Sequence, residues 1–404
     1  MSTLSPAASA SREATGPPPT VGVEEEFALL DPVSGEVALV AGEVIDACGD
    51  QHGIVPESMA YMVETRTPVC RTLDEVRHSL NAKRSRVATE ARRCGATMVA
   101  SGVAPYGVPD PPPVRRHPRY TPLLDAFPLA MSTTGTCGCH VHVAVPTPDV
   151  GVQVLLRLRR WLPALTVLST NSPIWQGRDV GWASMRYVFS SRWPTARPAP
   201  PVATIADYDE FVRTAILAGL ALDPRSIYLI ARISPRHPTV EVRIADVFLT
   251  VEETVAYVGL VRALVGKAVA DVARAGPVVD VAQDALVDAC REAACGGLCG
   301  RVADPASGKL LGGWQLADAL VAHVLPYLDR YRDTDRVLST LYRLRVVGSG
   351  AERQRRMFAA ARTAEEYVVA LADATTGRLA RGQPLRPERS RLVPPRESAG
   401  RSSR

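Results

Sequence analysis

Four segments of the chain place carboxylates, imidazoles and guanidiniums at alternate positions. They are residues 20–30 (TVGVEEEFALL), 61–69 (YMVETRTPV), 138–145 (GCHVHVAV) and 238–249 (PTVEVRIADVFL). Side chains of a β-strand point alternately to its two faces, so each segment is predicted to be a strand with one Val/Ile-rich face and one polar face. The polar faces carry Glu24 and Glu26, Glu64 and Arg66, His140 and His142, and Glu241 and Arg243.

Carboxylates that share a sheet face need cations beside them. Two carboxylates about 4 Å apart repel by about 4 kcal/mol at an effective dielectric constant of about 20. Oxygen ligands with one imidazole suit a hard divalent ion such as Mg²⁺ or Mn²⁺, and Mg²⁺ commonly completes its coordination with substrate phosphates. Because lysine occurs only at positions 83, 267 and 309, we expect arginine to contact these phosphates. The candidates are Arg66, Arg186 and Arg243.

A structural explanation competes with this functional one. A single Glu-x-Arg or His-x-His on an alternating strand is commonly the solvated side of an antiparallel sheet. Four such strands in one chain favour a site for chemistry. Glu25 falls on the apolar face between Val23 and Phe27 and is expected to have a buried partner.

Five motifs, in this order, resemble the carboxylate-amine ligase family, known as glutamate–cysteine ligase type 2. The similarity runs from about residue 20 to about residue 372. The motifs are GVEEEF (22–27), VETRTPVC (63–70), CGCHVHV (137–143), GRDVGWASMR (177–186) and PTVEVR (238–243).

The resemblance implies an α+β fold like that of glutamine synthetase, in which a curved antiparallel sheet forms an active-site funnel. It also implies an enzyme that uses ATP to convert a carboxylate into an acyl phosphate, which an amine then attacks. In the named reaction the acid is glutamate, the amine is cysteine and the product is γ-glutamylcysteine. By position, the resemblance assigns Mg²⁺ or Mn²⁺ to Glu24, Glu26, Glu64, His140 and Glu241. It assigns catalysis to Arg186 and Arg243, and contacts with substrate or ATP to Arg66, Arg186, Arg232 and Arg243.

Four positions depart from the family pattern. Leu229-Ile230 stands where Trp-Asp is usual, Arg197 where Gly is common, and Met185 where an aromatic residue is frequent. These changes leave the acid and the amine open. Two alternatives therefore remain: the same ligase chemistry on another pair of substrates, and a nucleotide or metabolite binder without activity.

Composition predicts one large domain between two unstructured ends. We expect a disordered leader at 1–19, a ligase domain at 20–374 that is mostly helical over 276–374, and a disordered basic tail at 375–404. Eight arginines and two glutamates after residue 377 account for the net charge of +5, so the rest of the chain is close to neutral. No aromatic residue is interleaved in the tail, which argues against specific nucleic-acid binding.

Localisation and partners follow from the same composition. No stretch of about 20 apolar residues is free of charge, and the leader has no apolar core of a secretion signal, so we expect a soluble, cytoplasmic protein without membrane partners. The partners expected are small molecules, namely amino acids and ATP, and the sequence leaves a homodimer open. The eight cysteines are predicted to be reduced thiols. Cys290, Cys295 and Cys299 lie near a turn but lack a second Cys/His pair at zinc-binding spacing, so their role stays open.

Helices are expected to complete the fold. Thr72 and Thr250 begin capping boxes for helices that run to about Gly95 and Gly276. Further helices are predicted at 149–168 and 205–222, with a proline-rich rigid loop at 194–201 near the site. Helices at 279–294, 314–332, 335–346 and 351–374 are expected to form a bundle against the Val-rich face of the sheet.

Overall fold

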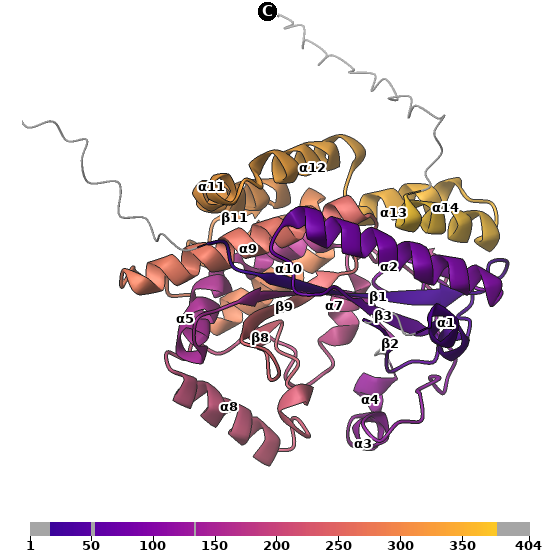
Figure 1. Ribbon diagram of the computed structural model, residues 1–404, viewed down its shortest axis with the longest axis horizontal. Helices are drawn as coiled ribbons and strands as arrows, with labels where there is room; N and C mark the ends of the chain where they lie inside the picture. The colour runs from indigo at the N-terminus through magenta and orange to yellow at the C-terminus, as the bar shows by residue number, and fades with distance from the viewer. Residues whose placement is uncertain (1–16, 50–52, 133–134, 378–404) are drawn as a thin grey trace, which may run out of the picture.

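The computed structural model describes residues 17–49, 53–132 and 135–377, and its centre is a seven-stranded sheet (Figure 1). The strand order is β2 (Ile54–Pro56), β3 (Met62–Arg66), β1 (Val21–Leu30), β5 (Gly138–Ala144), β9 (Thr239–Asp246) and β8 (Ala231–Ile233). The seventh strand, β4 (Thr97–Val99), pairs with the far end of β1. All pairs are antiparallel, which confirms the predicted kind of sheet and the four predicted strands.

The register brings the polar residues of the four strands together. Glu24 lies opposite Arg66 on one side and His140 on the other, while Glu26 lies opposite Glu64. His142 lies opposite Glu241 on the next strand. The period-two pattern therefore predicted correctly which side chains share a face.

A β-bulge interrupts the regular pairing of β5 with β9. Cys139 pairs with Ala245 and Val141 pairs with Val242, so β9 has one more residue than β5 between these pairs. A bulge of this kind shifts the alternation of side chains by one position. As a result Ala245 lies in the apolar core, and Asp246 accepts hydrogen bonds from Asn171, Ser172 and Ser184, the last of which is the N-cap of helix α7 (Met185–Ser190).

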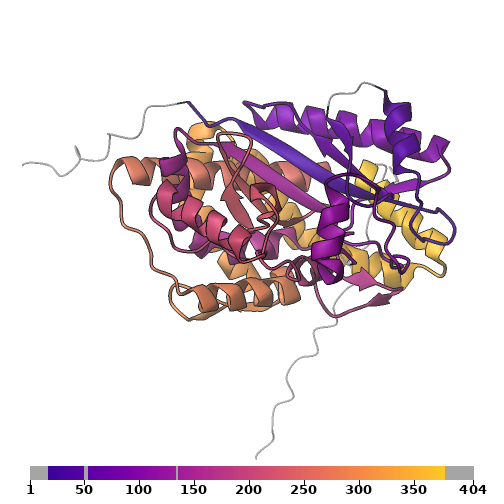
Figure 2. The same cartoon turned by 90° about the horizontal axis from the view of Figure 1, so that it is seen from below.

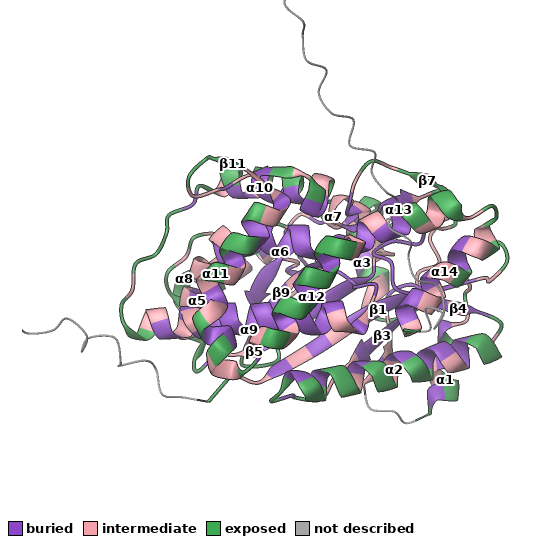
Figure 3. Ribbon diagram, turned by 90° about the horizontal axis from the view of Figure 1, so that it is seen from above, coloured by how far each residue is buried: buried purple, intermediate pink, exposed green. Residues whose placement is uncertain are grey.

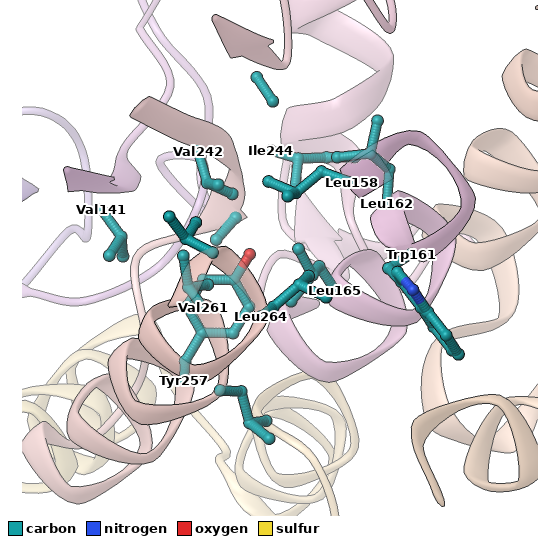
Figure 4. Close-up of a cluster of buried hydrophobic side chains, with 14 of the residues drawn as sticks. Val141, Leu158, Trp161, Leu162, Leu165, Val242, Ile244, Tyr257, Val261 and Leu264 are labelled. Carbon is teal, nitrogen blue, oxygen red and sulfur yellow. The ribbon is translucent and has the colours of Figure 1, made fainter. Parts of the chain in front are cut away.

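Helices cover the Val-rich face of the sheet. Figure 1 shows α9 (Val251–Ala273) and α2 (Leu73–Arg93) on this side, opposite α3 (Tyr120–Ala126), α4 (Pro128–Met131) and α8 (Ile205–Leu217). Figure 4 shows side chains of β5 and β9 packed against α9 and against α5 (Pro148–Leu158) and α6 (Leu162–Ser169). The labelled residues are Val141, Val242, Ile244, Leu158, Trp161, Leu162, Leu165, Tyr257, Val261 and Leu264.

The C-terminal helices form mainly an outer layer. Helix α11 (Gly313–Tyr331) packs on α9 and α6, α12 (Thr334–Val347) packs on α9, and α10 (Gln283–Gly296) packs on α6. Of the described C-terminal helices, only α14 (Ala364–Thr376) makes an extensive contact with the sheet, at β4. The expectation that this bundle packs directly on the Val-rich face is therefore wrong, because α9 already occupies that face. Figure 3 shows α9 as largely buried beneath the more exposed α12.

Helix boundaries differ from the prediction at several points, and two of the predicted helices are each divided in the structure. The predicted helix 149–168 is divided by a 3-10 turn, η1 (Arg159–Trp161), and α6 begins with Pro163 in its first turn. The predicted helix 351–374 consists of α13 (Gly350–Ala360) and α14, which have their own N-caps, Ser349 and Thr363. Thr72 caps α2 through the Glu75 amide, but the Thr250 hydroxyl donates to Glu253 instead of capping α9.

Short elements that the sequence analysis did not predict complete the fold. They are α1 (Ala41–Cys48), β2, α3, β4, α4, β6 (Ile174–Trp175), β7 (Arg178–Asp179), α7, η2 (Pro224–Ser226), β8, η3 (Gly297–Cys299), β10 (Arg301–Ala303) and β11 (Leu310–Gly312).

The predicted leader and tail lie almost wholly outside the described residues, so the division into domains stays a prediction. Helix α14 continues to Thr376, two residues past the predicted end of the ligase domain. In the described ranges, no helix has the length and apolar character needed to span a bilayer.

Candidate active site

The polar face of the sheet forms the floor of a cavity of about 250 Å³. Its walls come from the segments on the same side as α3 and α4, including α7, Trp193, and Ala196 of the predicted proline-rich loop. Figure 2 views the molecule from this side, with α3 in front of the strands. Each of the predicted site residues lines the cavity: Glu24, Glu26, Glu64, Arg66, His140, Arg186, Arg232, Glu241 and Arg243.

One group of candidate metal ligands consists of Glu24, His140 and Glu241, whose ligand atoms lie within 4.8 Å of one another. The Nδ1 atom of His140 is 3.2 Å from a carboxylate oxygen of Glu24. Burial and the neighbouring Arg243 lower the pKa of His140 to about 4, so its imidazole is neutral near pH 7 and offers a lone pair. Against the effect of burial, Arg243 and Arg232 lower the pKa of Glu241, so this carboxylate stays ionised.

A second group consists of Glu26, Glu57 and Glu64, again with ligand atoms within 4.8 Å. Burial, followed by the charge of Glu57, raises the pKa of Glu26 to about 7. Burial and the neighbouring carboxylates of Glu24 and Glu57 raise the pKa of Glu64 well above its usual value. Three crowded carboxylates with raised pKa values form a site that a divalent cation would stabilise. The five predicted ligands are therefore divided between two groups.

Glu57 is the member of this set that the sequence analysis missed. It follows the three-residue strand β2, whose sequence has no polar alternation to mark it. Its Oε2 atom accepts hydrogen bonds from the Ser58 amide at 2.9 Å and the Tyr120 hydroxyl at 3.3 Å. The carboxylate reaches the site because Val55 pairs with Glu64 across β2 and β3.

Three of the four candidate arginines are ion-paired with the acidic groups. Arg66 pairs with Glu64 and lies 3.5 Å from Glu24, and Arg243 pairs with Glu241. Arg232 makes a two-point contact with Glu241 at 2.7 and 3.3 Å. Its Nη1 atom also donates to the carbonyls of Ile227 and Arg225, so most of its donors are already used.

Arg186 is held by the backbone of β9. Its two Nη atoms donate to the carbonyls of Arg243 and Ile244, both at 3.1 Å, beside the β-bulge. Its Nε atom is buried without a hydrogen-bond partner among the described residues. Gly138 lies against this guanidinium, and a Cβ atom at that position would collide with it. Glycine is therefore required where β5 passes Arg186, and its amide donates to Glu26 at 2.6 Å.

Asp246 fixes the start of the helix that carries Arg186. Its carboxylate accepts hydrogen bonds from the hydroxyls of Ser172 and Ser184, both at 2.7 Å, and from the Asn171 amide at 2.8 Å. The Ser172 oxygen in turn accepts from the Arg186 amide, and the Ser184 oxygen caps α7 through the Tyr187 amide. Asp246 is 1% exposed and had no polar pattern in the sequence to identify it.

Glu25 points away from the cavity, as the alternation predicted. It makes a two-point ion pair with Arg84 of α2, at 2.9 and 2.6 Å, and accepts from the Thr254 hydroxyl of α9. Arg84 also donates to the carbonyls of Phe248, Leu249 and Thr375. This buried cluster supplies the partner that Glu25 was expected to need.

The departures from the family pattern lie at different distances from the site. Ile230 lines the cavity, whereas the exposed Arg197 does not and donates to the Pro194 carbonyl.

Cys139 is in the apolar core, on the opposite face from His140, which excludes a Cys-His nucleophile pair there. Cys290 is buried while Cys295 and Cys299 are exposed, and within the described ranges neither metal-ligand group includes a cysteine.

Comparisons with known proteins agree with this architecture. The family model of glutamate-cysteine ligase family 2 (GCS2) matches residues 20–376. A putative glutamate–cysteine ligase 2-1 of Saccharopolyspora erythraea is 43% identical over 350 residues, which are 86% of this chain and 92% of that protein. A putative glutamate–cysteine ligase 2 of Salinispora arenicola is 40% identical over 345 residues, covering 84% and 90% of the two chains.

Similarity of fold extends to a much more distant solved structure. The crystal structure of glutamate–cysteine ligase from Francisella tularensis in complex with AMP superposes with a TM-score of 0.64, over 91% of this chain and 90% of that chain, at 12% identity. This likeness confirms the predicted fold class. With the family model matching nearly the whole described chain, the protein belongs to glutamate-cysteine ligase family 2 and is an ATP-dependent ligase.

Proposed function

We propose that the protein joins glutamate to cysteine in an ATP-dependent reaction that passes through γ-glutamyl phosphate. The observation that carries this proposal is the pairing of two acidic groups with arginines on the floor of a single cavity. The names of the relatives, putative glutamate–cysteine ligases, support the choice of substrates.

The acidic groups suit divalent cations by their chemistry. Each group offers three ligand atoms. The first has two carboxylate oxygens and one imidazole nitrogen, and the second has three carboxylate oxygens. Both donor sets favour Mg²⁺ or Mn²⁺. Glu24, His140 and Glu241 would hold one ion, and Glu26, Glu57 and Glu64 a second. Bound ions would neutralise the phosphate oxygens of ATP and so make the γ-phosphorus accessible to a carboxylate.

The reaction then requires two substitutions. An oxygen of the γ-carboxylate forms a bond to the γ-phosphorus of ATP, and the bond to ADP breaks with its electron pair leaving on ADP. The amine nitrogen next bonds to the carbonyl carbon, loses a proton, and phosphate leaves with the electrons of the C–O bond. No covalent bond to the protein is needed.

The arginines have distinct roles in this scheme. Arg243 and Arg66 lie beside the acidic groups, where their guanidiniums would contact the transferred phosphoryl group. Arg186 is buried at the wall of the cavity, with its Nε atom unpaired among the described residues, and would stabilise charge on the acyl phosphate. Arg232 uses its donors within the protein, so we assign it to positioning Glu241 and the 225–227 segment.

A second candidate function is the same ligase chemistry on another acid and amine. Ile230 favours it, because an apolar side chain lines the cavity at this position and offers no charge to a polar amino acid. The difference concerns only the substrates, since neither metal-ligand group includes Ile230.

Hydroxamate formation tests both candidates. Purified protein is incubated with ATP, Mg²⁺, hydroxylamine and single acids from a panel that includes glutamate, and the hydroxamate and released phosphate are measured. Glutamate as the preferred acid, followed by ligation with cysteine in place of hydroxylamine, supports the first proposal. A strong preference for a different acid replaces it with the second, and the absence of product with every acid contradicts both.

A further inference from the structure

Three arginines outside the predicted site line the same cavity. They are Arg119, just before α3, Arg225 in η2, and Arg236 in the loop between β8 and β9. We call Arg119, Arg225 and Arg236 the arginine rim. Unlike the arginines of the floor, they come from loops and short helical turns, and Arg225 and Arg236 are exposed.

Hydrogen bonds and ion pairs connect the rim to the floor of the cavity. Arg119 donates to Asp223 at 3.0 Å, and Asp223 caps η2 through the Ser226 amide at 2.8 Å. The carbonyls of Arg225 and Ile227 accept hydrogen bonds from Arg232, whose other donors hold Glu241. The backbone that carries Arg225 is thus fixed to the same carboxylate that belongs to the first metal-ligand group.

The protein balances the charge of the rim only in part, because one carboxylate, Asp223, lies beside the three arginines. In the described part of the chain, no residue accepts a hydrogen bond or forms an ion pair with the guanidinium of Arg225 or Arg236. The one carboxylate paired within the rim is Asp223, and it is held by Arg119. Burial and the charges of Arg119 and Arg236 lower the pKa of Arg225, as expected where like charges gather.

On the floor, by contrast, three of the four arginines are paired with carboxylates, and Arg186 is bound by backbone carbonyls. Arg66 and Arg243 are paired with carboxylates, and Arg232 is bonded to Glu241. An anionic substrate that places one end at the acidic groups therefore meets unpaired guanidiniums at the rim. Guanidinium groups bind carboxylates and phosphates through paired hydrogen bonds, and each such contact is strengthened by charge.

We propose that the arginine rim is a binding subsite for an oxyanion of a substrate, remote from the reacting carboxylate. This inference rests on the proposed function and deepens it by assigning residues to substrate selection. The oxyanion is either a carboxylate of an amino-acid substrate or a phosphate of the nucleotide. Both are the same ligand chemistry, and kinetics with each substrate varied in turn distinguishes them.

The test replaces Arg225 and Arg236 with alanine, singly and together, and includes Arg225→Lys. The matched control is Arg213→Ala, since Arg213 is an exposed arginine of α8 that pairs with Glu210 and lies outside the cavity. KM and kcat are measured for ATP, for the acid in the hydroxylamine assay, and for the amine in the complete reaction. Melting temperatures show whether each variant is folded.

We expect Arg225→Ala and Arg236→Ala to raise KM for one substrate by about tenfold or more, the effect of losing a charge-assisted contact, while the control leaves it unchanged. Because the rim does not contact the reacting atoms in this proposal, kcat should stay within about threefold. A higher KM for ATP would identify a phosphate as the bound oxyanion, and a higher KM for the acid or the amine would identify the carboxylate of that substrate. The Arg225→Lys variant should bind this substrate more tightly than Arg225→Ala does. Unchanged KM values in the double variant overturn the subsite.

Calorimetric titration separates this inference from the proposed function. The probes are Mg-ADP and glutamate, each added to the wild type, Arg225→Ala, the double variant and Arg213→Ala. If no acid is activated but Arg225→Ala weakens binding of either probe by about tenfold, the subsite stands while the proposed function fails. If turnover and probe binding of the double variant match those of the wild type, the function stands and the subsite is wrong.

Discussion

The two acidic groups differ in what neutralises their carboxylates. Glu241 is paired with Arg232 and Arg243, which lower its pKa, whereas burial raises the pKa values of Glu26, Glu57 and Glu64 even though Arg66 pairs with Glu64. A bound cation would favour the ionised form of the second group. This difference makes the two groups separable by experiment.

Glu24→Gln and Glu241→Gln should each lower turnover by about a hundredfold, or about 2.7 kcal/mol of barrier, because an amide is a poorer ligand for a hard cation. The measurement is phosphate release as a function of Mg²⁺ concentration, in which both variants should need more Mg²⁺. Glu36→Gln, a change of an exposed carboxylate in a turn, is the control. Wild-type Mg²⁺ dependence in both variants would contradict the metal assignment.

Glu26 should make the stability of the metal-free protein depend on pH. Burial and Glu57 raise its pKa from 4.5 to about 7, so the folded state holds the proton more tightly than the unfolded state does. Its contribution to stability is therefore fully present below about pH 4.5 and is lost as the pH rises to about 7. Melting curves over this range without metal should show the wild type losing stability relative to Glu26→Gln. A constant difference between the two proteins would argue against the raised pKa.

Residue types and alternation predicted much of this site, and pairing geometry supplied the rest. The floor residues on four long strands followed from period two alone, because each strand alternates over several residues. Glu57 could not be found this way, since it reaches the site through the pairing of a three-residue strand with β3. Asp246 was hidden for a different reason: the β-bulge changes the face to which it points.

At the scale of elements, the connection between α7 and β9 decides where Arg186 lies. Asp246→Asn should lower kcat by about tenfold or more, because the amide can no longer accept both serine hydroxyls and the start of α7 becomes less well fixed. Ser184→Ala should have a smaller effect, since Ser172 still joins Asp246 to the Arg186 amide. If only the position of Arg186 changes, kcat should fall while the Mg²⁺ concentration needed for activity stays that of the wild type. A general loss of structure would instead change the Mg²⁺ dependence as well.

The buried contact of Glu25 in β1 with Arg84 in α2 and Thr254 in α9 is expected to contribute to the stability of the fold. Glu25→Gln removes the charge that Arg84 faces in the core and should destabilise the protein by about 3 kcal/mol, the cost of leaving a buried charge unpaired. Denaturant unfolding measures this change, with Glu36→Gln as the exposed control. The dependence of the remaining activity on Mg²⁺ should not change. If Glu25→Gln instead abolished the metal response, the assignment of faces along β1 would be off by one residue.

Helices illustrate what local sequence can and cannot predict. The long helices α2 and α9 were expected from their apolar spacing and capping residues. The division of 149–168 and of 351–374 was not, because the apolar spacing continues across both breaks and local sequence did not single out Thr363, which caps α14 at the second break. The position of the C-terminal helices was also mispredicted. The apolar face of a helix shows that something covers it, but not whether this is the sheet or another helix.

For the molecule as a whole, deletion of residues 378–404 should leave turnover within about threefold, a change of under about 0.7 kcal/mol in the barrier. The described residues end at Gly377, and those that line the cavity all precede residue 245. Deletion of 364–404 is the informative comparison, because it also removes α14 and with it the Thr375 contacts to Ala100 and Arg84. We expect that second protein to unfold at a lower denaturant concentration. Loss of activity on removal of the short tail alone would show that the tail contributes to the site.

Arg84 binds the carbonyl of Thr375 and, on its other side, the carboxylate of Glu25. Glu25 lies between Glu24 and Glu26, and Thr375 is translated 350 residues after it. The hydrogen bonds of Arg84, which holds the buried charge of Glu25, are therefore complete only after these residues have been made. Long-range contacts of this kind slow folding and leave incomplete chains open to aggregation. A chain that ends before α14 would contain every residue that lines the catalytic cavity but would lack the Thr375 carbonyl that binds Arg84.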